Sequence, residues 1–430
     1  MEDLRHCSAE ALRTFYEEAK KEYEAFLRAG ISINMARGRP SPEQLDLSDN
    51  LLNLTRADTG VLAEDGTDCR NYGGLCGLPT CRKLFGEIMG YPTENVIVAG
   101  SSSLNLMYDY VSQCCSHGVG GNEPWLFDPD RKFIAVVPGY DRHFAICAHF
   151  GLKMVSVPMT PAGPDMDLVE EIVKDPSVKG MFCVPKYSNP DGITYSRETV
   201  ERLAAMKTAA KDFRVLWDEA YVVHDLYDEK DELANVFEAA KKYGTEDRFV
   251  AFASTSKITF AGSGLSAMAA SDANFKEILA RLSLQIINYD KLNQLRHAYY
   301  YKTMDDIRAQ MKKHAALLRP KFDAVLNVLH KELDGLGIAS FNSPKGGYFI
   351  SLDVNVGSAK YVGRLCKDCG LVLTGVGATY PYGVDPNDAN IRIAPSCPSA
   401  AELDTAAKIL CAAVKIAACE ELLGIENGRG

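Results

Sequence analysis

The stretch that decides the fold is Arg248-Phe-Val-Ala-Phe-Ala-Ser-Thr-Ser-Lys257. Its apolar residues predict a short buried strand that ends at Ala253, and a polar Ser-Thr-Ser then leads directly to the lysine. A lysine amine at the end of a buried strand costs free energy unless the amine has a use. The hydroxyls of Ser254 and Ser256 are suited to hold a phosphate at the same place. The stretch therefore predicts a ligand site at a strand end.

Two upstream segments carry side chains that would complete such a site. Asp218 follows the apolar run 213–217 and precedes Tyr221, while Asn189 opens an Asn-Pro-Asp-Gly turn after the run 179–184. A strand-end lysine with an upstream aspartate and asparagine is typical of a site for pyridoxal phosphate (PLP). The lysine forms an imine with the cofactor, the aspartate meets the ring nitrogen, and the tyrosine and asparagine meet the ring hydroxyl.

Asp218 alone supports two interpretations. At about 4 Å and an effective dielectric constant near 20, a carboxylate attracts a protonated pyridine nitrogen by roughly 4 kcal/mol. That free energy equals about three pKa units, enough to keep the ring nitrogen protonated near neutral pH. A structural aspartate that pairs with backbone amides or a histidine fits the sequence equally well.

A serine cluster and a tyrosine are further candidates. Ser101, Ser102 and Ser103 precede a helical segment, whose N-terminus could bind an anion. Serines also cap helices at this position without any ligand. Tyr140 follows the expected strand 133–137, where its ring could stack on a planar cofactor or simply pack against the core.

Arg392 lies between apolar neighbours and could grip a substrate carboxylate with two guanidinium nitrogens, or face solvent from an edge strand. Asn189 could do no more than cap its Pro-Asp-Gly turn. No candidate decides the matter alone. Their joint occurrence in one order along the chain favours the PLP site. That order is a small polar loop, an aromatic residue, Asn-Pro-x-Gly, Asp-x-x-Tyr, Ser-x-Ser-Lys and a late arginine.

From about residue 79, apolar runs alternate with helical segments, which predicts βαβ units. Several runs are apolar throughout, as expected for a mainly parallel sheet between two layers of helices. The expected strands are 96–99, 133–137, 154–157, 179–184, 213–217, 248–253 and 265–270. Ligand sites of such sheets lie at the carboxyl ends of the strands, so the candidates above should meet there.

From about residue 303 the pattern changes to that of a smaller α+β domain. It shows a long helix over 303–334 that Pro320 could interrupt, then an alternating strand over 346–353, a helix over 358–369, a strand over 390–394 and a helix over 399–420. A chain of 430 residues also exceeds one ordinary core. We expect residues 1–50 to form an N-terminal helix and arm that join the small domain, 51–305 the large PLP-binding domain, and 306–430 the small C-terminal domain.

The composition excludes several classes of protein. The hydrophobic content of 47% and charged content of 24% are typical of a soluble globular protein, and a net charge of −10 disfavours binding to nucleic acid or an anionic membrane. The chain has no apolar stretch long enough to span a membrane and no apolar signal core at its charged N-terminus, so we expect a cytoplasmic protein. The thirteen cysteines are scattered, which favours reduced thiols. Cys366-Lys-Asp-Cys369 lacks the second pair of a zinc site.

At this point the chain resembles the class I aminotransferases of the fold type I PLP enzymes, from about residue 30 to 420. The strings Arg70-Asn-Tyr-Gly-Gly74, Pro138-Gly-Tyr-Asp-Arg-His-Phe144 and Ser254-Thr-Ser-Lys-Ile-Thr259 are most similar to the bacterial aspartate aminotransferases of subgroup Ic. The resemblance implies a ping-pong transfer of an amino group from an L-amino acid, aspartate or glutamate by this likeness, to a 2-oxoacid such as 2-oxoglutarate.

The resemblance also implies a role for each matching residue. Lys257 would form the imine and move the proton, while Asp218, Tyr221 and Asn189 would hold the cofactor ring. The other implied cofactor contacts are Tyr140 as the stacking ring, His143 as the support of the aspartate, and Ser101, Ser102, Ser103, Ser254 and Ser256 around the phosphate. Gly38 and Arg392 would face the substrate carboxylate, together with Asn189. Tyr72 would reach the phosphate of a neighbouring subunit, which implies a homodimer with shared sites.

Two features depart from the family pattern. Relatives carry an arginine shortly after the lysine that pairs with the phosphate, but the stretch 261–266 contains no cation. The arginine that reads a distal substrate carboxylate is also not identified, and Arg296, Arg39 and Arg142 are the candidates.

Two other functions stay open. A PLP-dependent lyase or decarboxylase uses the same fold and lysine. A non-catalytic PLP-binding sensor domain would accompany a DNA-binding module, for which the acidic chain offers no support.

Overall fold

An eight-stranded sheet forms the centre of the larger part of the molecule. The computed structural model describes residues 3–58 and 60–425. In it the strand order is β2-β9-β8-β7-β6-β3-β4-β5. The bounds are β2 Val96–Val98, β3 Lys132–Val137, β4 Lys153–Thr160, β5 Gly163–Pro164, β6 Val178–Cys183, β7 Arg214–Asp218, β8 Phe249–Ser254 and β9 Ser266–Ala270. All pairings from β4 through β3, β6 and β7 to β8 are parallel, which confirms the mainly parallel sheet expected from the sequence.

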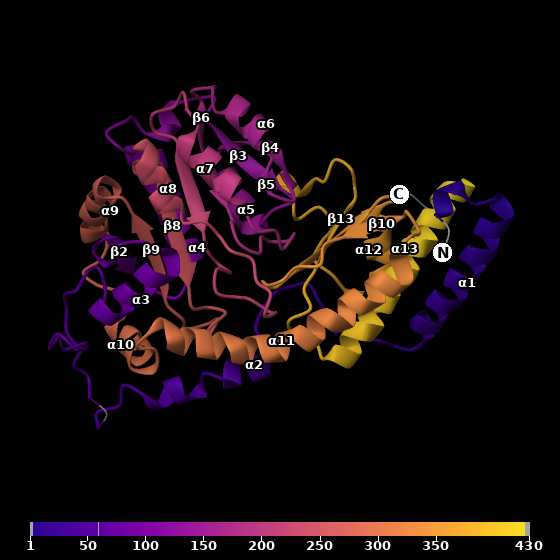
Figure 1. Ribbon diagram of the computed structural model, residues 1–430, viewed down its shortest axis with the longest axis horizontal. Coiled ribbons are helices and arrows are strands. Elements are labelled where there is room, and N and C mark those ends of the chain that lie inside the picture. Colours follow the sequence, from indigo (N-terminus) through magenta and orange to yellow (C-terminus); the bar gives the residue numbers. More distant parts are fainter. Residues whose placement is uncertain (1–2, 59, 426–430) are drawn as a thin grey trace.

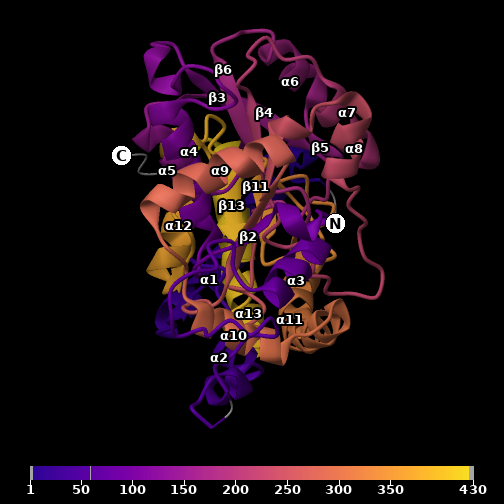
Figure 2. The same cartoon turned by 90° about the vertical axis from the view of Figure 1, so that its left-hand side faces the viewer.

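The central strands are buried on both faces. In β7, Val215 and Trp217 pack into one apolar cluster and Leu216 packs into another. The helices on the first face are α3 Pro79–Met89, α6 Met166–Ile172, α7 Arg197–Ala205 and α8 Val236–Tyr243. Those on the second face are α4 Ser103–His117, α5 Asp141–His149 and α9 Asp272–Gln285. Figure 2 shows α7 and α8 on one side of the sheet and α4 and α5 on the other.

A three-stranded antiparallel sheet organises the smaller part. Its order is β10 Ala339–Phe341, β11 Ile350–Val354 and β13 Asn390–Ile393, and α12 Ala359–Asp368, α13 Ala400–Leu423 and α1 Ala9–Arg28 accompany it. The arm after α1 returns to this part, because β1 Ile33–Asn34 pairs with β12 Leu371–Val372. Figure 1 shows α1 beside α13.

The strand expected at 346–353 begins later, at Ile350. Gly346 and Gly347 instead form a loop that packs tightly on Tyr187. A Cβ at Gly346 would lie 2.2 Å from the Tyr187 ring, and Gly347 has a φ of +83°. The two glycines therefore serve a close approach of backbone to an aromatic ring, which an alternating pattern does not reveal.

The long helix α11, Met304–Leu333, connects the two parts and continues through Pro320. It runs along the lower edge of the molecule in Figure 1, from α10 (Lys291–Tyr300) past α2 (Pro42–Asp46) towards α13. Single 3₁₀ turns lie at Leu4–His6, Asp49–Asn53, Thr93–Asn95, Trp125–Phe127, Glu246–Arg248 and Pro381–Gly383.

Within residues 3–58 and 60–425, no helix combines the length and apolar character that crossing a membrane requires. All thirteen cysteines lie in these ranges and are free thiols. The same residues contain no cluster of histidine, cysteine and carboxylate side chains suited to a metal ion. Cys366 and Cys369 are both buried, one in α12 and the other just after it.

Candidate active site

A cavity of about 580 Å³ lies where the loops after β3, β6, β7 and β8 face the small sheet. This volume is typical of a pocket for a small molecule. The residues proposed from the sequence that line it are Gly38, Ser102, Ser103, Tyr140, Asn189, Asp218, Tyr221, Ser254, Ser256, Lys257 and Arg392. The carboxyl ends of the parallel strands thus bring together side chains that are far apart in the chain.

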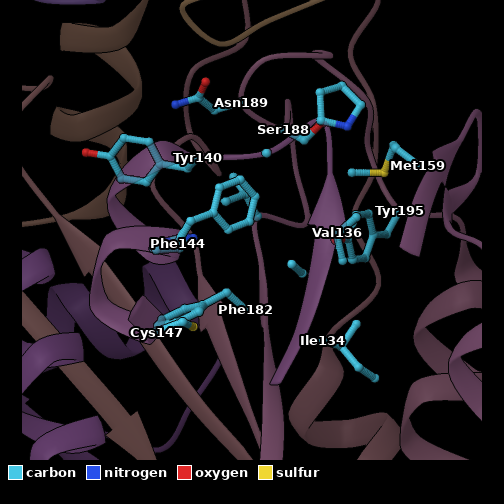
Figure 3. Close-up of a pocket in the computed structure, with 15 residues that line it drawn as sticks. Ile134, Val136, Tyr140, Phe144, Cys147, Met159, Phe182, Ser188, Asn189 and Tyr195 are labelled. Atoms are coloured by element: carbon cyan, nitrogen blue, oxygen red, sulfur yellow. The ribbon is translucent and has the colours of Figure 1, made fainter. Parts of the chain in front are cut away.

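A second cavity, of about 20 Å³, adjoins this region. Figure 3 shows Tyr140 and Asn189 at one end of it and Ile134 at the other. It has room for about one water molecule. The larger cavity is therefore the candidate site for a cofactor and a substrate.

Lys257 enters the larger cavity from the loop after β8. Its Nζ lies 5.0 Å from the centre of the Tyr221 ring and 5.7 Å from that of Tyr348. Burial lowers the pKa of the Lys257 amine, and the negative charge of Asp218 partly opposes this effect. A lowered pKa favours the neutral amine, which is both the nucleophile and the base in lysine chemistry.

The loop that carries this lysine, residues 255–264 (the lysine loop), is fixed from one side by α10. Nδ1 of His297 donates to the carbonyl of Asn293 at 2.8 Å, which leaves Nε2 as an acceptor 3.1 Å from the Thr259 hydroxyl. Asn293 also donates to the carbonyl of Gly264 at 3.0 Å. The middle and the far end of the loop are thereby attached to one helix.

α11 and α2 fix the other side of the lysine loop. Nε2 of His314 donates to the carbonyl of Ile258 at 2.9 Å, and its Nδ1 accepts from Gln44 at 3.0 Å. The same amide nitrogen of Gln44 donates to the Tyr348 hydroxyl at 2.9 Å. All four side chains are buried. This network therefore connects the residue next to Lys257 with the arm, the long helix and the loop before β11 of the small sheet.

Asp218 ends β7 and is buried. Its Oδ2 accepts a hydrogen bond from Nε2 of His143 at 3.1 Å, and the His143 ring stacks on Phe182 with 4.3 Å between the ring centres. Its Oδ1 has no hydrogen-bond partner among the described residues. A buried carboxylate oxygen without a donor is costly, so the free oxygen is suited to a cationic ligand atom.

The start of α4 is suited to bind an anion. Ser102 is the N-cap residue, and its side chain makes no capping hydrogen bond. The amide groups of the first turn of α4 are thus free of the usual side-chain cap, and they can bind an anion. Ser256 donates to the Ser101 carbonyl at 3.1 Å, which joins this helix start to the lysine loop. Ser101 itself does not line the cavity.

Arg392 lies on β13, the edge strand of the small sheet, yet it faces inward and is only 7% exposed. Its Nη1 donates to Asp141 at 3.0 Å and to Asn189 at 3.2 Å, and its Nε donates to the Thr374 hydroxyl at 3.3 Å. Its guanidinium carbon lies 5.0 Å from the centre of the Phe349 ring. The solvent-facing alternative for this arginine is therefore wrong.

Gly38 lies in the arm that covers the cavity. A Cβ at this position would lie 2.4 Å from Cζ of Phe349, so the absence of a side chain lets the arm pack on this ring.

Of the candidate arginines for a distal carboxylate, Arg39 and Arg142 also line the cavity, whereas Arg296 does not. Tyr72 is 78% exposed and lies outside the cavity of its own chain.

Among the charged, hydroxyl-bearing and aromatic residues that line this cavity, sequence reasoning missed Arg37, Asp141, Phe349 and Thr374. The sequence does place Asp141 at the start of a helix. An acidic residue is common there, because it interacts favourably with the helix dipole, so its position does not point to a site. Its actual partner, Arg392, lies 251 positions further along the chain. No short-range pattern could have connected the two.

Comparisons with known proteins identify relatives of this chain. The model of a family described as aspartate amino-transferase matches residues 7–426. The chain is 45% identical over 420 residues to an aspartate aminotransferase of Corynebacterium glutamicum, which covers 97% of this chain and 96% of that protein. A crystal structure of an aspartate transaminase from Corynebacterium glutamicum superimposes with a TM-score of 0.95 at 44% identity, covering 98% of this chain and 99% of the other. An α-aminoadipate aminotransferase from Thermus thermophilus shares the fold, with a TM-score of 0.71 at 20% identity over 91% of this chain and 94% of that one.

Proposed function

Because the chain belongs to the aspartate amino-transferase family, we propose that it uses PLP to transfer the amino group of aspartate or glutamate to a 2-oxoacid such as 2-oxoglutarate. One observation carries this proposal. The unpartnered Oδ1 of Asp218 and the amine of Lys257, whose pKa is lowered, face one cavity that also contains the uncapped start of α4. Asp218 would suit a ring cation, Lys257 an aldehyde, and the start of α4 a phosphate.

The residues present fit PLP at each of its groups. Asp218 would bind the ring nitrogen, Asn189 and Tyr221 the ring hydroxyl, and Tyr140 one face of the ring. The phosphate would lie against Ser102, Ser103, Ser254, Ser256 and the amides of α4, with Tyr72 added from a second subunit. Ser101 supports this cradle only through its carbonyl. The hydroxyls and helix amides would replace the cation that residues 261–266 lack. When bound, PLP supplies an acceptor for the electrons released as the substrate Cα loses its proton.

The chain's own residues would then bind the substrate and move one proton. Arg392 binds the α-carboxylate and thereby fixes the direction of the Cα–H bond. Lys257 takes the Cα proton as a base. As an acid it would then give this proton to the cofactor carbon that receives the amino group. His143 keeps Asp218 oriented through Oδ2, so that Oδ1 stays directed into the cavity. The oxoacid product leaves before the second oxoacid binds, which makes the reaction ping-pong.

The same proposal assigns the parts of the chain. Residues 51–305 would form the PLP-binding domain, and 306–430 with the arm 1–50 would close over it. Arg39 and Arg142 are the candidates for the distal carboxylate of a dicarboxylic substrate, because both line the cavity. Arg37, also at the cavity, joins them, whereas Arg296 could act only from another subunit.

The test is the visible absorption of the purified protein. The wild type should absorb visible light once PLP is added, and Lys257→Ala should lose both this band and turnover. Lys257→Arg is the matched control, because it keeps a long basic side chain at the same place but cannot form an imine, and it should lose the band and turnover as well. A wild-type protein that stays colourless and inert with PLP present would overturn the proposal.

The oxoacid acceptor separates transamination from other PLP chemistry. With aspartate or glutamate alone, each subunit should release at most one oxoacid, and turnover should begin only after 2-oxoglutarate is added. Sustained product formation without an acceptor would show a lyase or a decarboxylase.

Arg392→Lys should lower kcat/KM strongly, because a lysine cannot form the two parallel hydrogen bonds of a guanidinium.

A further inference from the structure

The guanidinium of Arg392 already holds an anion in this structure. Both protons of its Nη1 are used, one by Asp141 Oδ1 at 3.0 Å and the other by Asn189 at 3.2 Å. Nε donates to Thr374, whereas Nη2 has no hydrogen-bonding partner among residues 3–58 and 60–425. Of the two terminal nitrogens of this cavity-lining arginine, one is thus occupied and one is open.

A substrate carboxylate cannot form its best contact while this arrangement persists. Bidentate binding through the terminal nitrogens needs parallel donors from Nη1 and Nη2, and Asp141 occupies Nη1. A second carboxylate beside Asp141 would also place two negative charges around one positive charge. The incoming ligand must therefore displace Asp141 or accept a weaker, single-sided contact.

Asp141 is placed to be displaced. Its side chain is 35% exposed, whereas that of Arg392 is 7% exposed, so the acid can turn towards solvent and the arginine cannot. The two side chains also come from different parts of the molecule, α5 beside the large sheet and β13 in the small sheet. As the first residue of α5, Asp141 keeps a favourable interaction with the helix N-terminus when it turns away.

We propose that Asp141 is an internal counter-ion that occupies the carboxylate position of Arg392 until a substrate replaces it, and that it thereby sets how tightly the site binds carboxylates. This inference rests on the proposed function, since it takes Arg392 as the residue that binds the α-carboxylate. Asp141 acts through Arg392 and is thus a positioning and specificity residue. It balances a buried positive charge in the free enzyme and raises the ligand concentration needed for binding.

The test measures the affinity of the PLP-loaded enzyme for carboxylates that cannot react. Propanoate and succinate are titrated calorimetrically into the wild type and into Asp141→Asn. The variant should bind both acids about fivefold more tightly, the scale of one partly exposed ion pair. The KM for the amino acid should fall by the same factor, with a smaller change in kcat. Without ligand the variant should have a lower Tm, which either acid raises more than in the wild type.

Two control variants isolate the role of the charge. Asp141→Glu keeps the counter-ion and should keep the weak binding of the wild type. Asp167→Asn removes a similar first-turn aspartate that also pairs with an arginine, Arg202 at 2.6 Å, but lies outside the cavity. Its affinity for both acids should equal that of the wild type.

The outcomes separate this inference from the proposed function. If the wild type transaminates and binds succinate, but Asp141→Asn binds it equally or more weakly, the counter-ion role is wrong and the function stands. If the wild type binds neither acid and lacks transamination, the assignment of Arg392 fails and this inference fails with it. A variant that aggregates is replaced by Asp141→Ser, for which the same tightening is expected.

Discussion

At the scale of single residues, Asp218 depends on His143 for its orientation. The histidine both donates to Oδ2 at 3.1 Å and stacks on Phe182. His143→Phe keeps an aromatic ring in this space and removes the donor. We predict that it lowers kcat/KM about tenfold to a hundredfold, the usual effect of removing a hydrogen bond that orients a functional group. Steady-state kinetics with saturating PLP measures this loss.

Phe182→Leu is the matching control, because it weakens the stacking but keeps the hydrogen bond. It should lower Tm more than it lowers kcat/KM. If instead His143→Phe is fully active while Phe182→Leu is impaired, then His143 serves packing alone.

Residues that follow a buried strand could be predicted from the sequence, whereas residues in loops and at helix starts could not. Lys257, Asp218 and Asn189 could be predicted because each follows a buried run, where a polar side chain has few structural explanations. Asp141 and Arg37 could not, because charged residues in loops and helix starts are ordinary surface features. Their position at the cavity depends on how the small sheet lies against the large one, and no local pattern encodes that.

At the scale of elements, α10 controls the lysine loop through His297. Burial lowers the pKa of His297 from 6.5 to about 4, since the charged ring would lose its hydration. Between these values the unfolded chain binds the proton and the folded chain does not, so stability rises with pH across this window and is lost as pH falls. The lost free energy is about 3 kcal/mol at most.

We therefore predict that His297→Gln is less stable than the wild type at about pH 8 but loses less stability on acidification. The gap between the two Tm values should narrow from about pH 7 to about pH 5, as measured in parallel thermal scans. His117→Gln, an exposed histidine near the end of α4, should run parallel to the wild type throughout. A gap that stays constant would show that His297 does not resist protonation.

Elements were more predictable than their connections. Apolar runs give seven of the eight strands of the large sheet to within a few residues, because burial on both faces leaves little choice of side chain. The two-residue edge strand β5 was missed, because Gly163–Pro164 is not an apolar run. The hydrogen-bond network of Gln44, His314 and Tyr348 could not be predicted from the sequence. Gln44 lies in α2, His314 in α11 and Tyr348 in the loop before β11, and a polar residue in an amphipathic helix normally faces solvent. Only the packed structure shows that the three support the same loop.

At the scale of the whole molecule, the exposed segment around Tyr72 is where we expect a second subunit to bind. Gly73 donates to Asn288 at 3.2 Å and accepts from Lys291 at 2.6 Å, which attaches this segment to the chain after α9. Tyr72 is 78% and Ile287 is 60% exposed, so two large apolar side chains lie uncovered on connected segments. We expect a partner subunit to cover these side chains, as it covers contiguous apolar surface at protein interfaces.

We predict a homodimer in which Tyr72 of each subunit completes the site that contains Lys257 of the other. Tyr72→Ala should remain dimeric in light scattering but bind PLP more weakly, and Lys257→Ala should be inactive. When the two variants are unfolded together and refolded, about half of the dimers are mixed, and each mixed dimer holds one site with both native residues. The mixture should recover about a quarter of the wild-type activity at limiting PLP. Activity no higher than that of refolded Tyr72→Ala alone would place Tyr72 outside the partner's site, because only shared sites allow two damaged subunits to restore each other.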